Sequence, residues 1–153
     1  MTMQKSNLHK HTYPYKYPVG IRREMKRSDN KDGVPIQPLI PVKMNGVSFE
    51  ALLDSGATHV LIPRRIANLL KLDLGDKSQG SGASGRFDQF STTVNLSVGI
   101  GPKCDDIGVV EATVPVDEDI DIPILIGQNP VFDLYKVIFE KYKQKFQLLP
   151  KED

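Results

Sequence analysis

The chain has 153 residues, 39% of them hydrophobic, and a formal net charge of +1, which fits one globular domain with a modest core. No apolar run approaches the roughly 18 residues of a membrane span, and the first residues lack the apolar stretch of a secretory signal. The single cysteine, Cys104, cannot form an internal disulfide, so we expect a reducing, cytoplasmic location.

The charge is unevenly distributed along the chain. Residues 1–33 carry eight Lys or Arg and three Asp or Glu, a net charge of +5, and show no sustained strand or helix period. They are expected to form a basic, flexible N-terminal extension, partly packed on the domain that follows. A basic arm with tyrosines could contact nucleic acid, but residues 34–153 carry twelve basic and sixteen acidic residues and lack interleaved basic and aromatic strands. His9 and His11 have no further ligand candidate nearby in sequence, so no metal site is expected there.

Residues 34–153 are expected to form a compact, mainly β domain. Asn45-Gly46 lies between two apolar runs and accepts the positive φ angles of a type I′ turn, which predicts a hairpin over residues 38–44 and 47–53. Further strands are expected, in chain order, over residues 91–98, 107–114, 122–126, 136–140 and 144–149. Many short strands favour a closed β-rich fold.

Two short helices are expected among these strands. Pro63 can occupy the first position of a helix that places three apolar residues on one face, namely Ile66, Leu69 and Leu70. Asn129 can cap a second helix, with Pro130 at its first position.

The glycine-rich segment Gly80-Ser81-Gly82-Ala83-Ser84-Gly85 matches the G-x-G-x-x-G pattern of dinucleotide sites. Such a site needs an apolar strand before the glycines and a helix after them. Here the preceding residues 74–79 are mostly polar, and residues 86–94 have the pattern of a strand. We therefore expect a mobile hairpin and no nucleotide site.

The strongest chemical signal is the segment Leu52-Leu53-Asp54-Ser55-Gly56-Ala57-Thr58-His59. A carboxylate at the end of an apolar strand is costly unless hydrogen bonds compensate it. Ser55 offers a hydroxyl, and Gly56 lets the backbone approach closely enough to donate an N–H group. The segment therefore predicts a rigidly held carboxylate at a strand–loop junction, although an ordinary turn can have the same residues.

The order of the motifs resembles that of the retropepsin-like aspartic proteases, the single-lobe relatives of retroviral proteases. A hairpin, the Asp54 segment and the glycine-rich segment are followed by Ile124-Leu125-Ile126-Gly127, and the resemblance spans roughly residues 39–149. It implies a small closed β-barrel in which Asp54 is the catalytic carboxylate. It implies three further groups of site residues: Ser55, Gly56, Ala57 and Thr58 supporting the active-site loop, Gly80 to Gly85 as the flap, and Ile124 to Gly127 as the strand packed on the loop.

The chain departs from the retroviral pattern at two positions. Retroviral members usually carry an acid where Thr58 stands, paired with an arginine where Gln128 stands. Both charges are missing together, so we expect a neutral hydrogen bond to brace the loop instead.

Aspartic proteolysis requires two carboxylates that share one proton. The chain contains one Asp-Ser-Gly motif, so we expect a symmetric homodimer in which each subunit supplies Asp54. The resemblance suggests that the last strand, residues 146–149, contributes to the interface. The expected function is an aspartic endopeptidase acting on peptides or proteins, with no metal or organic cofactor and no membrane or nucleic-acid partner. The alternative is a catalytically silent dimeric module of the same fold that binds extended peptides.

Overall fold

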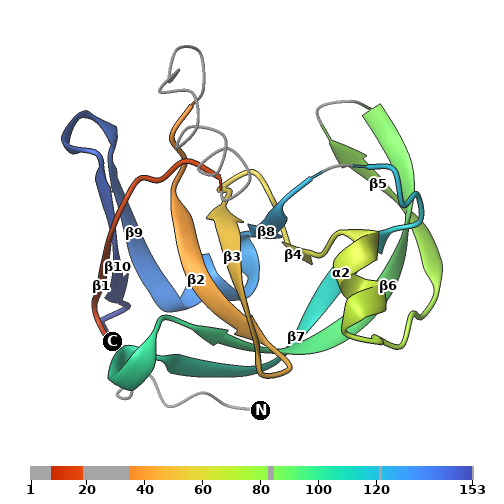
Figure 1. Ribbon diagram of the computed structural model, residues 1–153, viewed down its shortest axis with the longest axis horizontal. Helices are drawn as coiled ribbons and strands as arrows, with labels where there is room; N and C mark the ends of the chain where they lie inside the picture. The colour runs from red at the N-terminus through yellow and green to blue at the C-terminus, as the bar shows by residue number, and fades with distance from the viewer. Residues whose placement is uncertain (1–7, 19–34, 83–84, 121, 153) are drawn as a thin grey trace, which may run out of the picture.

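The computed structural model describes residues 8–18, 35–82, 85–120 and 122–152. These residues form a three-stranded and a seven-stranded sheet (Figure 1). The strands are β1 (His11–Pro14), β2 (Leu39–Met44), β3 (Val47–Leu53), β4 (Val60–Leu61), β5 (Lys77–Gly82), β6 (Gly85–Val98), β7 (Asp105–Pro115), β8 (Ile124–Ile126), β9 (Tyr135–Glu140) and β10 (Lys145–Pro150). The helical segments are α2 (Arg64–Leu69), η2 (Gly101–Lys103), η3 (Gln128–Phe132) and η4 (Lys141–Lys143). None of the helices in the described ranges has the length and hydropathy needed to cross a bilayer.

The larger sheet closes into a barrel. Its strand order is β2-β3-β8-β4-β7-β6-β5, and β2 also pairs with β6, with Val42 opposite Val98. The strands from β2 to β6 in that order therefore form a closed ring, and β5 continues the sheet beyond β6. Alternate residues of β6 point into the core, where Val94, Leu96 and Val98 are buried. The predicted closed, mainly β fold is confirmed.

Local turn chemistry determines the first hairpin and α2. Asn45 and Gly46 have φ angles of 49° and 83°, as the turn between β2 and β3 requires. Pro63 immediately precedes α2 as its N-terminal cap residue, one position earlier than expected. Leu69 was expected to share one apolar face with Ile66 and Leu70, but it is 67% exposed, whereas Ala67 is buried. The inward face of the helix contains Ile66, Ala67 and Leu70. Leu69 lies outside this face and is in contact with solvent.

The expected second helix is one short turn. Within η3, Asn129 has extended backbone angles, φ −112° and ψ 120°. The helical turn therefore starts after Asn129, and Pro130 is its first residue, as expected.

Part of the expected N-terminal extension belongs to the folded domain. β1 pairs antiparallel with β10, with His11 opposite Leu148, and β10 pairs on its other side with β9 (Figure 1). Lys16 and Gln37 exchange two further backbone hydrogen bonds, of 3.0 and 2.8 Å. The expectation of a flexible extension is therefore wrong for residues 8–18, because strand pairing fixes this segment. Residues 1–7 and 19–33 lie outside the described residues, and for them the extension stays a prediction.

The pairing of β1 changes the expected role of the last strand. The family resemblance placed the last strand, which contains Phe146 and Leu148, at a dimer interface. Both side chains are 0% exposed in the single chain. The rings of Tyr13 and Tyr15 lie 5.8 and 5.6 Å from that of Phe146, measured between centroids. Because β1 and β9 already pair with both edges of β10, exposed apolar surface gives no reason to place an interface there.

A buried carboxylate fastens β1 to the barrel. Asp105, at the start of β7, is 3% exposed and lies 2.8 Å from Nε2 of His11. The Tyr135 hydroxyl donates to it at 2.5 Å, and the His9 backbone N–H donates at 3.0 Å. Nδ1 of His9 lies 2.5 Å from the other carboxylate oxygen. The His-x-His pair therefore binds a carboxylate, and no group of three metal-ligating side chains suited to a metal occurs within the described ranges.

These contacts determine how Asp105 and its neighbours titrate. Burial raises the pKa of Asp105, but the hydrogen bonds from Tyr135, His11 and His9 outweigh it, so the pKa lies below its ordinary value. Burial and the nearby carboxylate raise the pKa of Tyr13 to about 12 and raise that of Tyr135 as well. The carboxylate form of Asp105 therefore stabilises the fold.

We expect Asp105→Asn to lower the free energy of unfolding by about 3 kcal/mol, because an amide cannot accept all of these hydrogen bonds. Asp106→Asn is the matched control, since Asp106 is exposed and an amide oxygen can still accept from the Gly108 N–H. The control should change stability by less than about 0.5 kcal/mol. Denaturant unfolding at pH 7 measures both changes.

The effect of Asp105→Asn has a defined pH dependence. Because the folded-state pKa of Asp105 is below the ordinary value of 3.8, the stabilisation is present above that value and disappears as the pH falls through the folded-state pKa. The difference between the wild type and the variant should therefore shrink in strong acid. Equal losses at residues 105 and 106 would contradict the assignment.

Candidate active site

Asp54 stands where β3 leaves the barrel. The preceding residue, Leu53, is buried, and it lies opposite Ile126 in the parallel pairing of β3 with β8. The Asp54 backbone N–H donates to the Ile126 carbonyl at 2.9 Å. The apolar ends of the two strands are thus buried together, which fixes the first polar residue after β3.

The carboxylate of Asp54 is held by its own loop. The Gly56 N–H donates to Oδ1 of Asp54 at 2.9 Å, and the Ala57 N–H donates to the Asp54 carbonyl at 3.1 Å. A Cβ atom at Gly56 would lie 3.3 Å from Oδ1, closer than most side chains tolerate. The N–H donor that the sequence predicted next to the carboxylate is therefore present, and a side chain at position 56 would crowd it.

The loop after β8 packs directly against the Asp54 loop. The Gln128 N–H donates to the Ala57 carbonyl at 2.8 Å, and the Asn129 N–H donates to the Thr58 carbonyl at 3.0 Å. A Cβ atom at Gly127 would overlap the Ala57 carbonyl, so this close approach requires glycine. Ile126 and Gly127 therefore lie against residues 54–58, whereas Ile124 and Leu125, the first half of the expected segment, pair with β3.

One side chain also joins the two loops. Nε2 of Gln128 donates to the Ser55 carbonyl at 2.9 Å, across 73 residues of sequence. A neutral hydrogen bond is thus present, as expected from the missing acid and arginine. The bond is made to the Ser55 backbone and not to Thr58, the position of the acid in the retroviral pattern.

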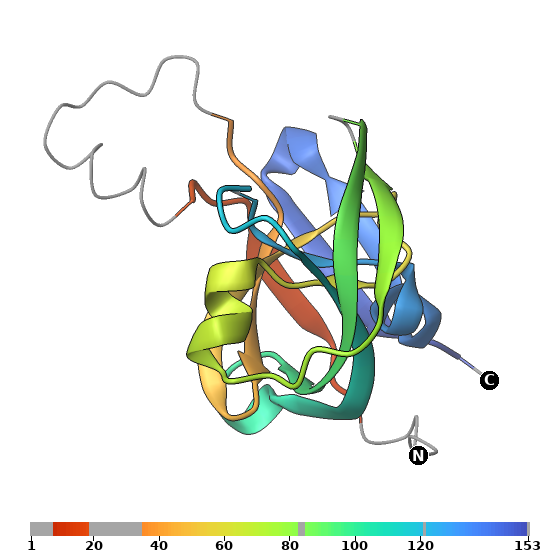
Figure 2. The same ribbon diagram turned by 90° about the vertical axis from the view of Figure 1, so that its right-hand side faces the viewer.

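The glycine-rich segment forms the end of a long hairpin. β5 and the first part of β6 pair antiparallel, with Gly80 opposite Phe87 and Gly82 opposite Gly85. The hairpin projects beyond the barrel (Figure 2). A Cβ atom at Gly80 would lie 2.6 Å from Oε1 of Gln89 and 3.1 Å from the Phe87 ring, so glycine at this position leaves room for both side chains. Ser81 is exposed, and the remaining predicted flap residues, Ala83 and Ser84, lie outside the described residues.

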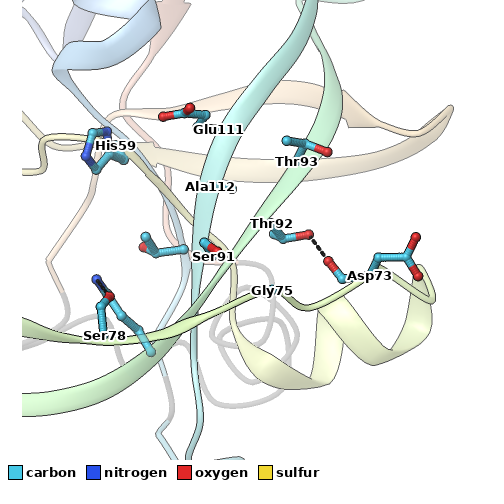
Figure 3. A pocket seen from close by; sticks show the side chains of 11 residues that line it. His59, Asp73, Gly75, Ser78, Ser91, Thr92, Thr93, Glu111 and Ala112 are labelled. Carbon is cyan, nitrogen blue, oxygen red and sulfur yellow. Dashed lines mark hydrogen bonds between the residues drawn. The ribbon is translucent and has the colours of Figure 1, made fainter.

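A pocket of about 520 Å³, lined mostly by residues with polar side chains, lies between the segment after Asp54 and the flap strands (Figure 3). It is lined by His59, Asp73, Gly75, Ser78, Gln89, Ser91, Thr92, Thr93, Glu111, Ala112 and Thr113. The Thr92 hydroxyl donates to the Asp73 carbonyl at 2.7 Å and ties the wall together. Sequence reasoning missed this pocket because its residues come from separate segments. The only available signal was the alternation of polar residues along β6 and β7.

Comparisons with known proteins agree on family and fold. The family model described as aspartyl protease matches residues 40–129, more than half of the chain. The chain is similar to a retropepsin-like aspartic protease from Rickettsia conorii, with 18% identity, a TM-score of 0.57, and 92% of this chain and 91% of that chain covered. It is also similar to the EIAV protease complexed with the inhibitor HBY-793, with 24% identity, a TM-score of 0.50, and 69% and 94% covered. No curated protein sequence matches the chain.

We expect Gly127→Ala to lower the free energy of unfolding by about 2–3 kcal/mol, because the new methyl group would overlap the Ala57 carbonyl. Gly82→Ala is the control, since its new methyl group would make an ordinary 3.5 Å contact with Phe87. The control should change stability by at most about 1 kcal/mol. Denaturant unfolding compares the two variants, and equal effects would show that the loops do not need the close approach.

Proposed function

The chain belongs to the aspartyl protease family and has the retropepsin-like fold, and on this premise we propose that it is an aspartic endopeptidase with Asp54 as its catalytic carboxylate. The observation that carries the proposal is the carboxylate at the end of a barrel strand, fixed by the Gly56 N–H. The loop after β8 braces the same turn through the Ala57 and Thr58 carbonyls.

The proposed reaction uses two such carboxylates and one water molecule. The ionised carboxylate accepts a proton from water while the water oxygen attacks the peptide carbonyl carbon, and the protonated carboxyl donates to the carbonyl oxygen. The tetrahedral intermediate then collapses as the amide nitrogen takes up a proton and leaves as an amine. Because like charges about 3 Å apart do not both ionise easily, the pair works while it holds one proton.

The second carboxylate is proposed to come from a second copy of the chain. The sequence has one Asp-Ser-Gly motif, and a two-fold axis beside Asp54 would pair it with its own symmetry mate. Ser55, Gly56, Thr58 and Gln128 are exposed in the single chain, so this surface is free to meet a partner. Any dimer that completes the site must bury the surface around Asp54, whatever else it covers.

The other site residues receive proposed roles from this arrangement. Ser55, Gly56, Ala57 and Thr58 support the catalytic turn, and Ile124 to Gly127 form the strand that holds it. The hairpin around Gly80 to Gly85 is the proposed flap, which would close over an extended peptide or protein substrate. A cytoplasmic location is proposed from the single cysteine, Cys104.

Asp54→Asn is expected to reduce peptide hydrolysis by at least about 10³-fold, because an amide cannot share the required proton. The thermal unfolding midpoint should stay close to that of the wild type. Digestion of a peptide library measures activity, with Asp106→Asn as the active control.

The wild type should follow a bell-shaped pH profile with an acidic optimum. Peptide binding without turnover in the wild type would favour the silent binding module instead.

Mixing subunits tests the shared site. In the presence of a ninefold excess of Asp54→Asn chains, activity per wild-type chain should fall about tenfold, because random pairing leaves few wild-type homodimers. Specific activity should also fall on dilution below the dimer dissociation constant. Sedimentation velocity at the assay concentrations provides the dimer fraction. A fully active monomer would contradict the proposal and would require a second carboxylate within the same chain.

A further inference from the structure

We propose that Gln128 is a positioning residue for Asp54 and acts through the peptide unit that joins Ser55 to Gly56. The inference rests on the proposed function, because the carboxylate that it concerns is the proposed catalytic one. The Gln128 side chain bonds to the Ser55 carbonyl and not to the carboxylate itself.

The geometry depends on two hydrogen bonds made by one peptide unit. Its carbonyl, from Ser55, accepts from Nε2 of Gln128 at 2.9 Å. Its N–H, from Gly56, donates to Oδ1 of Asp54 at 2.9 Å. A peptide unit is planar and nearly rigid, so holding its carbonyl also fixes the direction of its N–H. The orientation of the Gln128 amide is thus transmitted to the carboxylate oxygen of Asp54.

The backbone of Gln128 is itself fixed. Its N–H donates to the Ala57 carbonyl at 2.8 Å, and the next N–H, from Asn129, donates to the Thr58 carbonyl at 3.0 Å. Because a carbonyl oxygen only accepts, the amide nitrogen of Gln128 must face Ser55. The side chain therefore bridges the loops from an anchored base and in one orientation.

The bond should matter more for chemistry than for stability. In the single chain both Gln128 and Ser55 are exposed, so water can replace the bond there when the amide is removed. The folded state then loses little, but the Ser55–Gly56 peptide becomes free to tilt and to carry the donor away from Asp54. Small misplacements of catalytic groups lower turnover strongly. Because the proposed dimer would bury this surface, the dimer fraction of each variant is measured by sedimentation velocity at the assay concentration.

Gln128→Met removes the N–H donor to the Ser55 carbonyl and keeps the length of the side chain, so it tests the role of this hydrogen bond. We expect kcat to fall about tenfold while KM changes less than about twofold and the unfolding midpoint is retained. A purely structural role would instead lower the unfolding midpoint together with activity.

Gln128→Glu supplies a pH-dependent rescue. An ionised carboxylate repels the Ser55 carbonyl, whereas the protonated form has an O–H that can donate to it. The ratio of variant to wild-type kcat should therefore rise as the pH falls through about 4.3, the ordinary pKa of glutamate. Gln128→Met should show no such recovery. Gln144→Glu, at an exposed position in the β9–β10 turn, introduces the same charge and should give a flat ratio.

A readout without turnover separates this inference from the proposed function. Solvent exchange of the Gly56 amide proton, measured by NMR, should be several-fold faster in Gln128→Met because its acceptor is less well aligned. Faster exchange in a protein that hydrolyses no peptide would uphold the positioning role and overturn the proposed function. Unchanged Gly56 exchange and unchanged kcat in an active enzyme would overturn the positioning role, as would equal losses for Gln128→Glu at every pH.

Discussion

The site depends on the parallel pairing of β3 with β8, which brings together two segments far apart in the sequence. Leu53 and Ile126 are buried as neighbours, and the chain leaves the barrel immediately after each of them. Apolar burial therefore determines where the polar loops begin, and backbone hydrogen bonds such as that from Asp54 to Ile126 determine how they face each other. The barrel therefore positions the start of the Asp54 loop, and the Gly56 N–H then orients the carboxylate.

The residues that complete the fold around β10 differ from those of the candidate active site. β1 and β9 pair with both edges of β10, and Phe146 and Leu148 are buried without a partner chain. The Asp105 carboxylate fixes β1 to the start of β7 through His9 and His11. In the proposed mechanism a second subunit supplies the second carboxylate, whereas the core around β10 is complete within one chain.

Features that depend on neighbouring residues were accessible from the sequence, and features that depend on distant ones were not. The Asn45-Gly46 turn and the alternation along β6 each follow from local backbone or packing requirements. Gly127 was found only through the family resemblance, because its close contact is with Ala57, far away in the sequence. The place of β1 does not, because His11 finds Asp105 across 94 residues. The basic composition around β1 indicated a solvated arm, and tertiary pairing overrode that local preference. The pocket beside His59 was missed for the same reason.

The neutral link between the two loops has a consequence for acid–base chemistry. An acid–arginine pair beside the active-site loop would add charges close to a carboxylate pair that must hold one proton, and it would weaken wherever its acid became protonated. The amide of Gln128 and the carbonyl of Ser55 carry no formal charge and do not titrate in the working range. The brace between the loops therefore stays the same across the acidic range in which the proposed dyad changes its protonation. In this chain a change of pH would therefore alter the protonation of the proposed dyad without altering the hydrogen bond that holds the two loops together.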